Sequence, residues 1–227
     1  MKLTEILKSN RLLLAAYGAA LAACIVWLCC GSKADIFLAI NADLGKAVDG
    51  LMRLVSNGGT FTVIGPVCLI LLLFVSCRKG LAATAAVCLS PVVTQFGKRV
   101  VWPDAPRPKI LIEQLLAQNP DLQIHLVDGV HLHSSHSFPS GHTTGAFALF
   151  GTLALMAKKP LWKLFWLLLA CLVGYSRMYL SQHFLIDVTV GSFIGMTAAV
   201  LCWWWLQHYR ASWLDRPLIR CSRQTSA

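Results

Sequence analysis

The sequence predicts an all-α membrane protein that crosses the bilayer six times. Of its 227 residues, 56% are hydrophobic and only 13% are charged, and the mean hydropathy is +0.63. A run of about 17 to 25 apolar residues can span a bilayer as a helix, because a helix satisfies its own backbone hydrogen bonds. Six runs of this kind are expected to be transmembrane helices: Leu12–Gly31, Phe61–Cys77, Leu81–Gly97, His142–Ala157, Leu161–Leu180 and Val188–Gln207.

The connections between these runs differ greatly in length. The segment 32–60 mixes apolar and polar residues, and we expect it to form an amphipathic helix lying along the membrane interface. The segment 98–141 is the longest polar block, and its apolar positions before Asn119-Pro120 predict a short helix. No added domain is evident, so residues 1–227 are interpreted as a single membrane-embedded domain.

The positive charges indicate how the chain is oriented. The formal net charge is +10, and most lysines and arginines fall at the two ends of the chain and in the short turns on the same side. The excess of positive charge marks the cytoplasmic side, so both termini are expected there and the segments 32–60 and 98–141 outside. The basic tail fits anionic lipid headgroups better than nucleic acid, because it lacks interleaved aromatic residues; its arginines are Arg210, Arg216, Arg220 and Arg223.

Neither the cysteines nor the loop histidines predict a metal site or a cofactor. The nine cysteines lie almost wholly in apolar runs or in the tail and have no CxxC spacing. His131, His133 and His136 have a spacing that could bind zinc, but no cysteine or carboxylate stands beside them. A loop that lines the substrate is the favoured interpretation.

Three polar clusters are expected to meet at the outer ends of the predicted helices. Each lies where an apolar run begins or ends, and all fall on one side of the membrane if the six helices are correct. Ionisable groups at such positions cost free energy, so they usually pair with an opposite charge or take part in function. The clusters comprise Lys98 and Arg107, then Ser140, Gly141 and His142, then Arg177, His183 and Asp187.

The chemistry of these clusters suits a phosphoryl group. Ser140 can cap a helix whose first amides bind an anion, and Gly141 leaves room beside the backbone. His183 and Asp187 share a helix face, so Asp187 can fix the tautomer of His183 and leave its other nitrogen free as a nucleophile or base. The cations of Lys98, Arg107 and Arg177 could then stabilise the charge of a phosphoryl transition state.

The same residues resemble the signature of the type 2 phosphatidic acid phosphatase (PAP2) family. That signature has a lysine before Arg-Pro, the tetrapeptide Pro-Ser-Gly-His, and Ser-Arg followed by a His with an Asp four residues beyond. The resemblance covers about residues 80–207. Eight residues separate Lys98 from Arg107, two more than is usual in the family, so either the intervening chain bulges or Arg99 replaces Lys98.

The resemblance implies a metal-independent lipid phosphatase of the bacterial cytoplasmic (inner) membrane, with its active site facing the periplasm. In that mechanism His183, oriented by Asp187, attacks phosphorus, and His142 protonates the leaving oxygen and then activates water. Lys98, Arg107, Arg177, Ser140 and Gly141 hold the phosphoryl oxygens. Lipid A phosphate or undecaprenyl pyrophosphate is the favoured substrate, with phosphatidylglycerol phosphate and phosphatidic acid as alternatives; a non-catalytic lipid-phosphate carrier is the alternative function.

Overall fold

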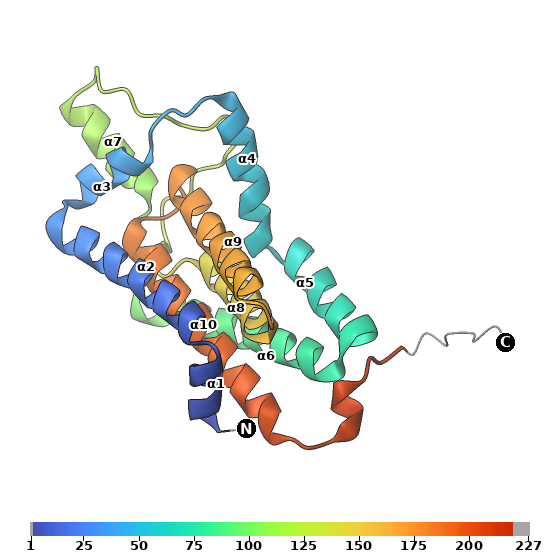
Figure 1. Cartoon of the computed structure of the whole chain (residues 1–227). Helices are drawn as coiled ribbons and strands as arrows, with labels where there is room; N and C mark the ends of the chain where they lie inside the picture. Colours follow the sequence, from blue (N-terminus) through green and yellow to red (C-terminus); the bar gives the residue numbers. More distant parts are fainter. Residues whose placement is uncertain (1, 220–227) are drawn as a thin grey trace.

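The computed structural model describes residues 2–219, and these residues form helices without any strand (Figure 1). The all-α prediction is therefore confirmed. Short 3-10 or π-helical turns at Asn57–Gly59, Leu71–Val75, Gly97–Val101 and Ser212–Asp215 supplement the α-helices. The α-helices are α1 (Leu3–Ser9), α2 (Arg11–Cys30), α3 (Lys33–Ile40), α4 (Lys46–Ser56), α5 (Phe61–Ile70), α6 (Cys77–Phe96), α7 (Pro108–Gln118), α8 (Gly141–Met156), α9 (Pro160–Tyr179) and α10 (Leu185–His208).

Helix α8 is the central helix of the bundle. It packs against α6, α9 and α10, and nearly all of its residues after His142 are buried. Helix α2 lies across α9 and α10, α4 lies along α9, and α5 packs on α6 (Figure 1). The sequence of α8 suits this position, because it is apolar on every side and contains small residues that allow close helix packing.

Helices α8 and α10 approach each other closely at their N-terminal halves. A Cβ atom at Gly191 would lie 2.8 Å from the carbonyl oxygen of Ser140, and one at Gly195 would collide with the carbonyl oxygen of Thr144. The backbone N–H of Ser140 also donates a hydrogen bond of 3.0 Å to the carbonyl oxygen of Asp187. The beginning of α8 is thus fixed directly against the beginning of α10.

Membrane-spanning character is clear for most of the predicted segments. Helices α2, α9 and α10, together with the helix Cys77–Val101, are long and apolar enough to cross a bilayer, and the pair Lys46–Gly59 and Phe61–Val75, bent by 53°, is a fifth candidate. Helix α8 has 16 residues, about 24 Å of rise, which is less than the roughly 30 Å hydrocarbon core. A count of six spans therefore stays a prediction.

The segment expected to be one amphipathic helix consists of two helices, α3 and α4. Ser32 caps α3 by accepting a hydrogen bond of 3.1 Å from the backbone N–H of Asp35. At the other end, the buried side chain of Asn41 donates to the carbonyl oxygen of Tyr179 and to the Ser181 hydroxyl. This attachment to the end of α9 breaks the helix. The short helix expected before Asn119-Pro120 is confirmed as α7.

The two ends of the described chain lie at the end of the bundle opposite to α3 and α7 (Figure 1). Arg78 there forms a salt bridge of 2.6 Å with Asp215 and donates to the carbonyl oxygens of Leu206 and Tyr209. Arg78 thereby ties α6 to the segment after α10. Of the tail arginines, Arg210 and Arg216 lie within the described residues, whereas Arg220 and Arg223 lie outside them.

We predict that Gly195→Ala destabilises the protein. The added methyl group would meet the backbone of α8, which cannot move aside as a flexible side chain can, so the free energy of unfolding should fall by about 1–3 kcal/mol. Thermal unfolding in detergent measures the change. Gly18→Ala is the matched control, because a Cβ at Gly18 meets nothing within 4 Å. Equal melting temperatures for both variants would contradict the close helix contact.

Candidate active site

The candidate site forms where three parts of the chain meet: the N-terminus of α8, the turn between α9 and α10, and the loop between α6 and α8. The contact between α8 and α10 brings the first two together. Two hydrogen bonds hold the distant parts of the loop together, from the backbone N–H of Ser137 to Ala105 and from that of Arg107 to Ser134. The hydroxyl of Ser137 attaches the loop to α10 by donating to Asp187. All the residues predicted from sequence for this site therefore lie at one end of the bundle.

His183 and Asp187 form a buried pair. The Nδ1 atom of His183 lies 3.3 Å from Oδ2 of Asp187, and each side chain is no more than 3% exposed. The same Oδ2 atom accepts a hydrogen bond of 2.9 Å from the backbone N–H of Phe184. With Nδ1 directed to the carboxylate, Nε2 is the nitrogen left for chemistry. Burial lowers the pKa of His183, with Asp187 opposing the shift, so the imidazole is neutral at neutral pH.

Ser137 completes this pair and could not be identified from the sequence. Its buried hydroxyl donates a hydrogen bond of 2.5 Å to Oδ2 of Asp187 and lies 3.5 Å from Nδ1 of His183. A serine in a long polar loop carries no periodic or motif signal. Its position two residues before Pro139 becomes informative only when the loop is seen folded against α10.

Lys98 and Arg107 converge on one backbone carbonyl. Nζ of Lys98 lies 3.1 Å from the carbonyl oxygen of His136, and Nη2 of Arg107 lies 3.4 Å from the same atom. Arg107 also donates through Nε to Ser135 and through Nη1 to Gln182. These bonds to neutral carbonyl oxygens orient both cations and leave part of their hydrogen-bonding capacity for an anionic ligand.

Arg177 reaches the site from the last turn of α9. It donates through Nη1 to the hydroxyl of Ser56, at 2.6 Å, and through Nη2 to the side-chain oxygen of Gln182, at 3.4 Å. Its Nε atom is buried and has no hydrogen-bond partner among residues 2–219. A buried N–H of a guanidinium without a partner is costly, and an anionic ligand would satisfy it.

The Pro-Ser-Gly-His segment begins α8. Ser140 is fully buried and caps the helix, accepting hydrogen bonds from the backbone N–H and the hydroxyl of Thr143. A Cβ atom on Gly141 would meet nothing within 4 Å, so the space beside this backbone is open. His142 is half-buried, and Arg177, His183, Lys98 and Arg107 all lie within electrostatic range of it. The N-terminus of α8, which carries Ser140, Gly141 and His142, thus lies at the same end of the bundle as the cations and His183.

The structure favours Lys98 over Arg99 as the first cation of the site. Lys98 turns toward the loop and contacts His136, whereas Arg99 is exposed. Both residues belong to the π-helical turn Gly97–Val101, whose wider winding accommodates extra residues. The longer spacing between Lys98 and Arg107 is taken up in this turn and in the bend that follows it.

The loop histidines do not assemble a metal site within the described part of the chain. Residues 2–219 contain no group of three or more His, Cys, Asp or Glu side chains that could hold a metal ion. His131 and His133 pack ring against ring, with centroids 4.9 Å apart. They line a polar pocket together with Arg107, Lys109 and His136.

Together, the helical membrane fold and a buried His–Asp pair among three cations define a phosphatase that acts on lipids. The profile of the PAP2 superfamily matches residues 79–211, more than half of the chain. The chain belongs to the PAP2 superfamily, and it is a lipid phosphatase by class. The carrier alternative is accordingly set aside.

Individual relatives agree with this assignment. An undecaprenyl-diphosphatase of Sulfolobus acidocaldarius is 30% identical over 170 residues, which cover 73% of this chain and 74% of that protein. The crystal structure of Aquifex aeolicus LpxE matches with a TM-score of 0.62 and 27% identity, covering 75% of this chain and 93% of that one. A PAP2-type phosphatidylglycerolphosphate phosphatase of Bacillus subtilis shares the fold, with a TM-score of 0.60, 21% identity, and coverage of 93% and 98%.

We predict that Ser137→Ala lowers kcat by roughly tenfold with little change in KM. The substitution removes the hydroxyl that holds Asp187, so the carboxylate would orient His183 less well while the cations stay in place. Phosphate release by the purified protein measures the effect. Ser134→Ala, in the same loop but with an exposed side chain, is the control. Equal kcat values for the two variants would remove Ser137 from this role.

Proposed function

We propose that this protein hydrolyses a terminal phosphate group from a membrane lipid through a phosphohistidine on His183. The observation that carries the proposal is the buried His183–Asp187 pair, which directs Nδ1 to the carboxylate and leaves Nε2 for chemistry. Arg177, at the end of α9, adds a buried Nε that has no hydrogen-bond partner among residues 2–219. Binding an anion alone requires neither a nucleophile nor an acid. The pair and His142 therefore support catalysis as well as binding.

In the first step, Nε2 of His183 attacks the phosphorus atom. A nitrogen–phosphorus bond forms as the bond between phosphorus and the lipid oxygen breaks, and His142 donates a proton to that oxygen. Asp187 accepts the Nδ1–H of the phosphorylated ring and stabilises its positive charge. Lys98, Arg107 and Arg177 stabilise the negative charge on the phosphoryl oxygens, and Ser140 and the Gly141 amide at the start of α8 add to this.

In the second step, water attacks the phosphorus from the side that the lipid has left. His142, now neutral, takes the proton of this water, and the electron pair of the nitrogen–phosphorus bond returns to His183. Inorganic phosphate and the original enzyme result. Side-chain cations supply the charge stabilisation throughout, so the scheme includes no metal ion.

Undecaprenyl diphosphate is our preferred substrate, with lipid A phosphate as the second candidate. The name of the Sulfolobus relative, which matches over most of both chains, supports a polyprenyl diphosphate. Phosphatidylglycerol phosphate and phosphatidic acid are further alternatives. We place the protein in the bacterial inner membrane with six spans, both termini in the cytoplasm and the site at the periplasmic face, in accord with the distribution of lysine and arginine.

Trapping the covalent intermediate tests this mechanism. In His142→Ala, a substrate labelled with ³²P and carrying a good leaving group should still phosphorylate His183, whereas hydrolysis of the intermediate should slow by about 10²-fold or more. The label should be acid-labile and base-stable and should map to His183. Adding His183→Asn to this variant is the control and should abolish labelling. Label that persists in the double variant would contradict the mechanism.

A further inference from the structure

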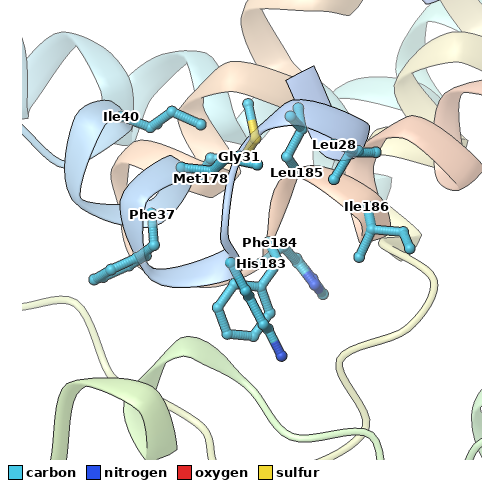
Figure 2. A pocket seen from close by; sticks show the side chains of 11 residues that line it. Leu28, Gly31, Phe37, Ile40, Met178, His183, Phe184, Leu185 and Ile186 are labelled. Carbon is cyan, nitrogen blue, oxygen red and sulfur yellow. The ribbon is translucent and has the colours of Figure 1, made fainter. Parts of the chain in front are cut away.

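An apolar pocket lies directly beside the candidate site (Figure 2). Its walls come from the end of α2, from α3 and from the turn between α9 and α10. His183 itself lines this pocket, so the pocket and the site share a residue. The other lining residues are mostly aliphatic or aromatic and include Leu28, Ile36, Phe37, Met178, Leu185 and Ile186.

The walls of the pocket come from two different parts of the chain. His183 and its neighbours belong to residues 79–211, which match the superfamily profile. Leu28, Ile36 and Phe37 precede that region and belong to helices that the profile does not cover. The pocket therefore joins His183, which lies within the profile match, to apolar residues of α2 and α3, which lie outside it.

The pocket adjoins surface that faces hydrocarbon if α2 crosses the membrane. Helix α2 is apolar but hardly buried within the bundle. Immediately before Leu28, the side chains of Val26 and Trp27 are exposed, and Ile186, at the start of α10, is 46% exposed. A hydrocarbon chain could pass from the bilayer into this pocket without crossing water.

Lys33 stands at the rim of the pocket. Its Nζ atom lies 3.7 Å from the centre of the Phe184 ring, which places a positive charge beside the residue that follows His183. Lys33 is also within electrostatic range of Asp187. It forms no salt bridge among the described residues, so its charge is available to an anion. Lys98, Arg107 and Arg177 are the cations assigned to the phosphoryl group being transferred.

We infer that this pocket binds the first carbons of a prenyl chain, and that Lys33 binds the second phosphate group of a polyprenyl diphosphate. This inference rests on the proposed function and narrows its substrate class. The transferred phosphate would lie among Lys98, Arg107 and Arg177, and the phosphate that stays on the lipid would lie nearer Lys33. A chain attached to the second phosphate then has an apolar surface within reach.

Two ligands that cannot be hydrolysed allow binding to the pocket to be measured without the reaction. One is a farnesyl diphosphate analogue with a methylene bridge between its phosphorus atoms, and the other is methylenediphosphonate, which lacks the chain. With the full-length protein in detergent, Leu28→Trp should fill the pocket and raise the Kd of the farnesyl analogue roughly tenfold. The Kd of methylenediphosphonate should change by less than about twofold, because no chain enters the pocket.

Val26→Trp is the matched control, since it adds the same bulk to an exposed position on the same helix that does not line the pocket. Leu28→Ser provides a second test if the tryptophan of Leu28→Trp prevents folding. It too should raise the Kd of the farnesyl analogue and leave that of methylenediphosphonate unchanged. If the Kd values of both ligands rise equally, or neither Kd rises, the pocket does not bind the prenyl chain. If the wild-type protein releases no phosphate from any lipid while this binding pattern holds, the proposed function is refuted, but the inference that the pocket binds a prenyl chain stands.

Lys33→Gln tests the charge at the rim. It should lower the ratio of kcat/KM for farnesyl diphosphate to kcat/KM for farnesyl phosphate by about tenfold, since only the diphosphate has a second phosphate group. Lys46→Gln, an exposed lysine at the start of α4 that does not line the pocket, is the control. An unchanged ratio in Lys33→Gln would refute this role for Lys33.

Discussion

The arrangement of the whole site depends on the direct contact between the N-termini of α8 and α10. Gly191 and Gly195 let the two backbones approach, and the hydrogen bond from Ser140 to the carbonyl oxygen of Asp187 fixes their register. His142 follows Ser140 by two residues, and His183 precedes α10 by two. Any slip of one helix along the other would separate these histidines. Small residues at the crossing are thus a condition for the chemistry as well as for packing.

The second constraint is electrostatic. Cations held close together in a partly buried region repel one another and lose hydration, so they require compensating acceptors. The backbone carbonyls of Ser135 and His136 supply part of this compensation to Arg107 and Lys98. The buried Nε of Arg177 has no acceptor among the described residues. The region therefore favours binding of an anion, and the free energy of binding a phosphate can offset the repulsion and lost hydration of the clustered cations.

Much of this architecture could be predicted from the sequence because its signals are local. Apolar runs identified the helices. The four-residue offset of His183 and Asp187 predicted a contact on a shared helix face. The contact forms, but the shared face is wrong, because His183 lies two residues before α10 and only Asp187 is on the helix. The contributions of Ser137, Gln182 and Ser56 could not be predicted, because they depend on how distant loops fold together. Likewise, Asn41 breaks the segment 32–60 through contacts with Tyr179 and Ser181, far away in the chain. Helix α8 matches the predicted apolar run His142–Ala157 in length, but hydropathy did not show whether this run is buried in the bundle or spans the membrane, since both kinds of helix have the same composition.

The most direct measurement is a structure of the protein with bound orthovanadate, which resembles phosphorus with five ligands. We expect vanadium bonded to Nε2 of His183, its equatorial oxygens contacting Arg107, Arg177 and the N-terminus of α8, and His142 beside the apical oxygen opposite His183. Vanadate bound away from His183, or His142 pointing out of the site in that complex, would contradict the shared site on which the proposed reaction depends.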